Sequence, residues 1–338
     1  MNKEITTGIL AYGMSGKVFH APFINAHQGF KLHAITERNQ KQAEIDYPGI
    51  ISYNTIEETI NDAAVELIII NTPNFTHFDY AKSALSAGKH ILVEKPFTAT
   101  IDEAKELFEL ADKTGKQIFF YQNRRWDSDY TVVKKVIESG RLGKLNEVHF
   151  RYDRYRTAIG PKTFKEEPFA ASGLMYDLGP HLLDQAISIF GKPVTFHKIL
   201  GKNRKGTKVD DYFSIHLGYP NSVNVFVHAN LLLVAPLPAF VLHGENGSLH
   251  KKRSDIQEEQ LLKGMKLTDE AYGIELPGNE AKLTLIDAEG NRTEEFIPSM
   301  EGSYLPLFDA VYESIINDAA YPVTREQVLI QLEILEAS

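Results

Sequence analysis

The chain has 338 residues, no cysteine, and a formal net charge of −9 from 36 basic and 45 acidic residues. Its length allows two domains with a sizeable core. The lack of cysteine excludes disulfides, thiolate metal sites and cysteine nucleophiles, and we expect no metal site. Because the charge gives no extended basic field, we expect no nucleic-acid partner. The first residues lack a signal-peptide pattern and no apolar run approaches about eighteen residues, so we expect a cytoplasmic protein that does not span a membrane.

The first third of the chain alternates strand and helix patterns. The patterns predict strands at 5–11, 30–36, 65–71, 90–93 and 117–121, and helices at 16–26, 40–46, 56–61, 77–87 and 102–114. Strands that alternate with helices need crossover connections, which indicates a parallel sheet. Residues 1–122 are therefore expected to form an α/β domain with a doubly wound, Rossmann-type sheet.

Beyond residue 123 strand patterns dominate. We expect strands at 145–156, 194–200, 211–218, 222–230, 239–244 and 281–287, and helices at 130–139, 175–190, 304–317 and 324–337. Tight turns between consecutive strands, such as residues 219–222, favour antiparallel pairing. Residues 123–338 are therefore expected to form an α+β domain with a large, open, mostly antiparallel sheet, in which residues 251–279 are a long loop.

A glycine-rich loop joins the first strand to the first helix. Its sequence, Ala11-Tyr12-Gly13-Met14-Ser15-Gly16, follows the G-x-G-x-x-G pattern with alanine at the first position. The second glycine of this pattern lets the backbone approach a pyrophosphate, and the third allows close packing of helix on strand. The loop therefore predicts a dinucleotide site whose pyrophosphate is held by backbone N–H groups and the start of the helix. The candidate contacts are Tyr12, Gly13, Met14, Ser15 and Gly16.

The end of the second strand bears on the choice of cofactor. Glu37 lies about twenty residues after Gly16, where a carboxylate accepts hydrogen bonds from ribose hydroxyls and favours NAD. Arg38 follows directly, and a guanidinium there would instead bind the 2′-phosphate of NADP. An ordinary exposed Glu-Arg pair is a third interpretation, so the choice between NAD and NADP stays open.

The fourth predicted strand leads to further candidate contacts. It ends at Asn71-Thr72-Pro73-Asn74, which would line the ribose and nicotinamide of the cofactor. The same residues can serve as a turn that caps the next helix, with Asn74 or Thr76 as N-cap. The candidate cofactor contacts outside the glycine loop are Glu37, Arg38, Asn71, Thr72, Pro73, Asn74, His77, Glu94, Lys95 and Asn123.

A lysine stands at the carboxyl end of the next buried strand. Strand 90–93 runs directly into Glu94-Lys95-Pro96. In open α/β sheets the ligand lies outside the carboxyl ends of the strands, so Lys95 is expected to face it. Pro96 biases the residue before it towards an extended conformation, which holds the ammonium on a stiff backbone. The alternative is a solvated lysine that only ends the strand.

A second cluster of reactive residues lies on the predicted helix at 175–190. Asp177 and His181 are four residues apart and share one helix face, and Asp184 lies near His181. The other face is largely apolar, so these polar groups need partners or a cavity. Pro180 lacks the N–H for a helical hydrogen bond, so we expect the helix to start or bend there. A histidine in such a helix is otherwise a satisfied structural residue.

Three motifs resemble those of the Gfo/Idh/MocA family of nicotinamide-dependent sugar and polyol dehydrogenases. They are the glycine loop, Glu94-Lys95-Pro96 and Asp177-x-x-x-His181, and the resemblance covers essentially the whole chain. Residues 16–22, 123–127 and 176–181 also resemble the branch that contains NADP-dependent scyllo-inositol dehydrogenases. Members of that branch usually carry a short polar-basic sequence after the second strand, where this chain has Thr-Glu-Arg-Asn, so the resemblance leaves the cofactor choice open.

The resemblance implies an oxidoreductase that transfers hydride between a secondary alcohol of a polyol, inositol or cyclic sugar and NAD or NADP. In this mechanism His181 would be the general base, Lys95 would polarise the carbonyl oxygen, and Asp177 would orient the imidazole or bind a neighbouring hydroxyl. The expected substrate contacts are Lys95, Asn123, Arg124, Tyr155, Asp177 and His181. For the arginines the alternative is a solvated ion pair.

Two other functions stay open, and we also expect self-association. One alternative reduces a non-sugar carbonyl or imine, and the other is a catalytically idle NAD(P)-binding sensor or regulator. Residues 223–228 alternate so that both faces of the second sheet carry apolar side chains, while helices are available for one face. The uncovered face predicts a homodimer or homotetramer.

Overall fold

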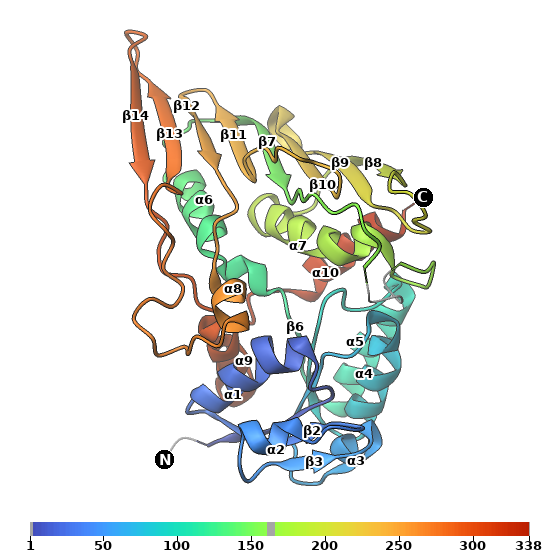
Figure 1. Ribbon diagram of the computed structural model, residues 1–338. Helices are drawn as coiled ribbons and strands as arrows, with labels where there is room; N and C mark the ends of the chain where they lie inside the picture. Colours follow the sequence, from blue (N-terminus) through green and yellow to red (C-terminus); the bar gives the residue numbers. More distant parts are fainter. Residues whose placement is uncertain (1–2, 161–165, 338) are drawn as a thin grey trace. The chain divides into compact units, whose positions relative to one another are not determined.

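The computed structural model describes residues 3–160 and 166–337, which pack as two compact units (Figure 1). Unit 1 consists of Met1–Asn123, Glu258–Glu270 and Tyr304–Thr324; unit 2 consists of Arg124–Gln257, Ala271–Ser303 and Arg325–Ser338. Each unit therefore draws on separate stretches of the chain. The division into domains at residues 122 and 123 remains a proposal.

Unit 1 is built on a parallel six-stranded sheet with the order β3-β2-β1-β4-β5-β6. Its strands are β1 (Ile5–Ile9), β2 (Phe30–Thr36), β3 (Ile51–Tyr53), β4 (Leu67–Ile70), β5 (His90–Val93) and β6 (Ile118–Phe120). All four side chains of β4 are buried, as expected for a strand covered on both faces. The strand order reverses between β1 and β4, and open α/β sheets bind ligands at such a point. The predicted doubly wound sheet is confirmed.

Helices cover both faces of this sheet. Figure 1 shows α1 and α9 on one face and α4 and α5 on the other. Helix α5 begins with a reciprocal capping box between Thr100 and Glu103, and ends at Gly115 with a positive φ of 67°. The helical segments are η1 (Gly16–His20), α1 (Ala21–Ala26), α2 (Gln42–Asp46), α3 (Ile56–Asn61), η2 (Asn74–Thr76), α4 (His77–Ser86), α5 (Ile101–Thr114) and α9 (Leu305–Asn317).

Unit 2 is built on an eight-stranded sheet with the order β14-β13-β12-β11-β7-β10-β9-β8. The strands are β7 (Leu145–Arg151), β8 (Thr195–Gly201), β9 (Tyr212–Gly218), β10 (Asn224–Asn230), β11 (Phe240–Gly244), β12 (Gly247–Lys251), β13 (Ala281–Ile286) and β14 (Arg292–Ile297). Strands β7 and β10 pair in parallel and the other neighbours are antiparallel. The predicted open, mostly antiparallel sheet is therefore confirmed.

The helices of unit 2 gather on one face of its sheet. Figure 1 shows α6 (Ser128–Glu138), α7 (Gly173–Phe190) and α10 (Arg325–Glu336) on the same side. Helix α7 packs on β10 and against α10. Among the described residues of unit 2, no helix covers the opposite face, so half-buried side chains alternate with buried ones along β9 and β10.

Four short elements depart from the sequence expectation. Strands β3, β12 and β14 were not predicted, and helix α8 (Gln257–Leu262) lies within the expected long loop. Helix α7 continues through Pro180 instead of starting there. Across the described residues no helix is both long and apolar enough to cross a bilayer.

Candidate active site

The glycine loop of unit 1 has the geometry of a phosphate-binding turn. A side chain on Gly16 would place its Cβ only 2.2 Å from the Ala11 carbonyl oxygen, so this position must be glycine. A Cβ on Gly13 would meet no atom within 4 Å, so the backbone there borders open space. These are the two properties that the fingerprint requires of its third and second glycines.

Asn71 holds this loop in place. Its amide accepts a hydrogen bond from Ala11 N at 3.0 Å and donates one to Ala11 O at 2.8 Å. The end of β4 is thereby fixed to the end of β1. Sequence reasoning placed Asn71 against the cofactor, and in the structure both amide atoms serve the loop.

A cavity of about 560 Å³ lies next to the loop, within unit 1. This volume falls in the range of small-molecule sites. Its walls include four predicted cofactor contacts, Tyr12, Glu37, Arg38 and Thr72 with the adjoining Pro73. They also include residues that sequence reasoning missed, among them Thr36, Ile56, Phe75 and Tyr80. Phe75 is 49% exposed, and a large exposed aromatic directly after a strand-end proline was the signal available in the sequence.

A buried polar chain connects the glycine loop to the end of β5. Ser15 Oγ donates to Glu94 Oε1 at 2.7 Å, and His20 Nε2 lies 3.0 Å from the same oxygen. Burial raises the pKa of Glu94, but the contacts with His20 and Ser15 and the charge of Lys95 outweigh it and lower the pKa to about 2. Glu94 is therefore a carboxylate at neutral pH, directly before the half-buried Lys95.

His77 connects the two strand-end loops beside Lys95. Its Nδ1 lies 2.8 Å from Pro96 O and its Nε2 3.0 Å from Thr72 O. The ring is almost completely buried, and burial lowers the pKa of His77 against the opposing effect of the two carbonyl groups. We predicted His77 as a cofactor contact; the structure places it under the loops after β4 and β5 instead.

Unit 2 carries the second half of the predicted site on α7. His181 is 6% exposed and lies one helical turn after Asp177, which is half-buried. The third polar residue, Asp184, is bound elsewhere: Arg125 donates to both its oxygens at 2.7 and 2.8 Å, and Gln331 of α10 donates at 3.0 Å. Asp177 is therefore the carboxylate on this face that remains accessible beside His181.

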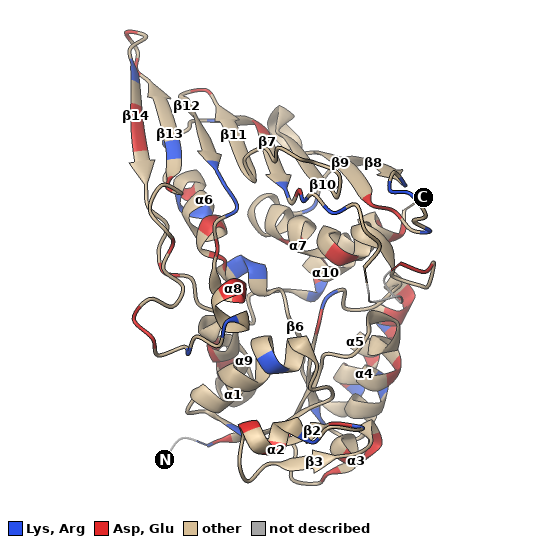
Figure 2. Cartoon of the chain, in the orientation of Figure 1, with Lys and Arg blue, Asp and Glu red and all other residues tan. Residues whose placement is uncertain are grey.

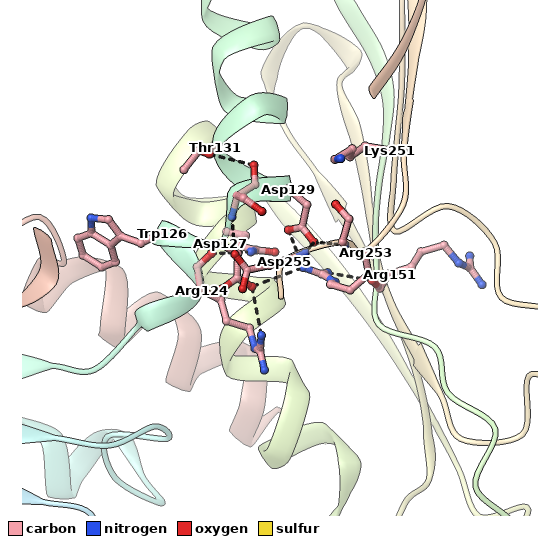
Figure 3. Close-up of polar contacts among 12 residues, drawn as sticks. Arg124, Trp126, Asp127, Asp129, Thr131, Arg151, Lys251, Arg253 and Asp255 are labelled. Carbon is pink, nitrogen blue, oxygen red and sulfur yellow. Dashed lines mark hydrogen bonds and ion pairs between the residues drawn. The ribbon is translucent and has the colours of Figure 1, made fainter. Parts of the chain in front are cut away.

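Arg124, a predicted substrate contact, belongs to a buried polar cluster at the start of α6 (Figure 3). Its Nη1 donates to Asp127 at 3.1 Å, and Arg253 donates to Asp129 at 3.3 Å. Asp255 accepts from Ser128 N at 2.7 Å. Burial and the charge of Asp255 raise the pKa of Asp127 well above its usual value.

The cluster joins the segment after β12 to helix α6, so part of Arg124 has a structural role. Asn123, which ends unit 1, is buried at 5% exposure, whereas Tyr155 in unit 2 is 60% exposed. Lys95 belongs to unit 1 and His181 to unit 2, and their convergence on one substrate stays a prediction.

The residues of unit 1 fit a dinucleotide. The open backbone at Gly13 offers room for a phosphate, and the adjoining cavity has an apolar wall, from Leu10, Pro73 and Phe75, for an adenine ring. No group of three or more potential ligand residues among those described is arranged to hold a metal ion. Lysine and arginine are interspersed with aspartate and glutamate along the helices of both units (Figure 2), which agrees with the absence of an extended basic field in the sequence.

Comparison with known proteins gives matches over nearly the whole chain. A family model described as "Oxidoreductase family, NAD-binding Rossmann fold" matches residues 5–122, and one described as "Oxidoreductase family, C-terminal alpha/beta domain" matches residues 134–338. The chain is 35% identical to scyllo-inositol 2-dehydrogenase (NADP(+)) IolW of Bacillus subtilis, over 99% of this chain and 92% of the relative. It is 36% identical to the uncharacterized oxidoreductase YdgJ of Escherichia coli, over 99% of this chain and 96% of the relative.

A solved structure agrees with these matches. The putative oxidoreductase yvaA from Bacillus subtilis superposes with a TM-score of 0.93 at 34% identity, covering 100% of this chain and 95% of the other.

Proposed function

Because this chain belongs to the Gfo/Idh/MocA family of oxidoreductases, we propose that it transfers hydride between a secondary alcohol of a polyol, inositol or cyclic sugar and a nicotinamide cofactor. The observation that carries the proposal is that both halves of the reacting machinery are intact. Lys95 stands at the end of β5, and Asp177 and His181 lie one turn apart on α7. The similarity to an inositol dehydrogenase over the full length supports the substrate class.

The nicotinamide ring, when bound, supplies the position that accepts or gives up the hydride. The residues of the chain handle the proton and the charge. His181 takes the proton from the substrate hydroxyl during oxidation, a role that contributes roughly 10²–10⁴-fold to the rate. The ammonium of Lys95 stabilises the negative charge that develops on the same oxygen. Asp177 orients the imidazole or binds a neighbouring hydroxyl.

The buried Glu94 supports this division of roles. As a carboxylate beside Lys95, it favours the protonated ammonium at the pH at which His181 must act as a base. Ser15 links the same carboxylate to the glycine loop. A shift of the cofactor loop would therefore be felt at Lys95.

The test is turnover of the purified protein with NAD or NADP and a panel of inositols and aldoses, followed by the absorbance of the reduced cofactor. We expect Lys95→Ala and His181→Ala each to lower kcat at least about 100-fold while cofactor binding persists. Lys105→Ala, which changes an exposed lysine on α5, is the matched control and should keep wild-type turnover. Wild-type turnover in Lys95→Ala would contradict the proposal.

The remaining interpretations give other results in the same experiment. A reductase of a non-sugar carbonyl or imine would bind the cofactor and act only on a wider substrate panel. An idle sensor would bind the cofactor and turn over nothing. The cytoplasmic location expected from the sequence stays a prediction.

A further inference from the structure

The cavity beside the glycine loop contains the determinant of cofactor choice. Among the charged residues of the chain, its walls include Glu37 and Arg38, which directly follow β2. The sequence allowed either residue to contact the adenosine ribose. The structure gives the two side chains different surroundings, and the inference below rests on these and on the proposed nicotinamide-dependent function.

The carboxylate of Glu37 is already bound by its own unit. Oε1 accepts a hydrogen bond from Gln42 N at 3.1 Å, and Oε2 accepts one from Ala43 N at 2.8 Å. Ser52 Oγ lies 3.4 Å from Oε2. The residue is 8% exposed, and the amides that it binds are in the first turn of α2. These amides would otherwise lack partners, so Glu37 serves α2 and its charge is compensated there.

The other acidic side chain near this loop is also occupied. Asp46, on α2, accepts a hydrogen bond from Tyr12 Oη at 2.8 Å and another from Gln42 Nε2 at 3.1 Å. Lys41 donates its ammonium to the Ser52 carbonyl at 2.6 Å. Arg38, in contrast, is exposed, lines the cavity, and forms no hydrogen bond or ion pair with any residue that the structure describes. It is the cationic side chain available to a ligand in this wall.

We propose that Arg38 binds the 2′-phosphate of NADP and that Glu37 is a positioning residue that shapes the loop, so the protein prefers NADP to NAD. A guanidinium matches the geometry of a phosphate with paired N–H donors. The carboxylate that would repel the phosphate is turned onto α2, where two amides bind it. NAD lacks the 2′-phosphate and gains nothing from Arg38.

Direct binding tests the proposal without a substrate. NADPH and NADH are titrated into the purified full chain, and the fluorescence of the dihydronicotinamide is read. We expect NADPH to bind at least about tenfold more tightly than NADH. In Arg38→Ala the affinity for NADPH should fall about 10- to 100-fold while that for NADH stays within about twofold. Arg38→Lys should keep part of the preference, because the charge remains and the paired donors do not.

Two further variants separate the charge at Arg38 from its surroundings. Lys41→Gln removes a positive charge three residues along the same loop and should leave the NADPH to NADH ratio unchanged. Glu37→Gln keeps an oxygen that can accept from an α2 amide, and should also keep the preference for NADPH. If Glu37 instead bound the ribose hydroxyls, Glu37→Gln would weaken NADH specifically, which would overturn the positioning role.

Competition with two adenosine fragments adds an independent measurement. Adenosine 2′,5′-bisphosphate should displace NADPH at a lower concentration than AMP, and the difference should vanish in Arg38→Ala. Tighter binding of NADH than of NADPH by the wild type, or an equal loss of both in Arg38→Ala, would overturn the proposal. If the binding pattern holds but no polyol is turned over, the proposed function fails while the assignment of Arg38 stands. If neither cofactor binds, both fail.

Discussion

Glu94 combines burial with a negative charge and connects three parts of the cofactor edge. Ser15 donates to it from the glycine loop, His20 contacts the same oxygen, and Lys95 follows it in the chain. A buried carboxylate without such partners would become neutral. Here the partners lower the pKa of Glu94 to about 2, against a usual value of 4.5.

The pH dependence of stability should therefore contain a contribution from Glu94. Because its pKa is lower in the folded state, its contribution is fully present above about pH 4.5 and is lost as the pH falls towards 2. We expect Glu94→Gln to lower the free energy of unfolding at pH 7 by about 3 kcal/mol, and the difference from wild type to shrink between pH 4.5 and 3. Urea unfolding at a series of pH values measures this, with the exposed Glu57→Gln as control. A difference that stays constant from pH 7 to 3 would contradict the assignment.

At the scale of single residues, the sequence predicted backbone requirements better than side-chain directions. Gly13 and Gly16 have the properties that the motif requires. Glu37, Asn71 and His77 lie at the predicted edge, yet their polar atoms bind neighbouring protein groups. Asn71 bonds to a residue 60 positions away, and no local pattern reveals such a partner.

At the scale of elements, α9 shows how unit 1 is completed from a distant part of the chain. Phe308 of α9 stacks on Phe23 of α1 with ring centroids 5.4 Å apart, and both side chains are fully buried. Tyr312 donates to Lys3 O, and Gln117 donates to Ser314 O. The periodicity of the sequence predicted this helix but assigned it to the second domain. Helix α9 is therefore part of the core of unit 1.

This packing makes α9 essential for the stability of unit 1. Phe308→Ala would leave a cavity against Phe23, and buried phenylalanine to alanine changes usually cost about 3–5 kcal/mol. We expect a large fall in the midpoint of thermal unfolding. Leu262→Ala, at a position that is 56% exposed, should change stability by less than about 0.5 kcal/mol. Equal effects of the two variants would show that α9 does not stabilise the unit through this contact.

Elements with strong periodicity were predictable, and elements at sheet edges were not. Helix α5 has a buried stripe formed by Ala104, Leu107, Phe108 and Ala111, which the sequence pattern identified. Strand β14 is exposed along almost its whole length, so it lacks the alternation that marks a half-buried strand. Strand β3 has three residues and lies at the edge of the other sheet. Pairing with a neighbouring strand, and not a local pattern, defines these elements.

At the scale of the whole molecule, the uncovered face of the unit 2 sheet carries a continuous row of side chains. We name it the outer row; strand pairing places one residue from each strand side by side. Its members are His197, His216, Phe226, His149, Val241, His250, Lys282 and Phe296. At its centre the Phe226 ring lies 4.9 Å from both the His149 and His216 rings, in stacked geometry.

The outer row gives the predicted homo-oligomer a specific location. The neighbours of Phe226 along β10, Val225 and Val227, are fully buried on the helix-covered face, so Phe226 itself points to the uncovered face. Aromatic and imidazole groups in contact, with the charged Lys282 towards one end, form a surface that a second copy of the same face can cover. We therefore expect the wild-type chain to be a dimer or tetramer in solution.

A charge at the centre of the outer row tests this location. Phe226→Glu would bury a carboxylate in the interface at a large desolvation cost, so we expect a monomer by light scattering at micromolar concentration. Binding of the reduced cofactor to unit 1 should persist, because Phe226 belongs to unit 2. Ser86→Glu adds the same charge at an exposed position on α4 and should leave the mass unchanged. A wild-type monomer under these conditions would remove the prediction of an oligomer, whereas an oligomeric Phe226→Glu would place the interface on another surface.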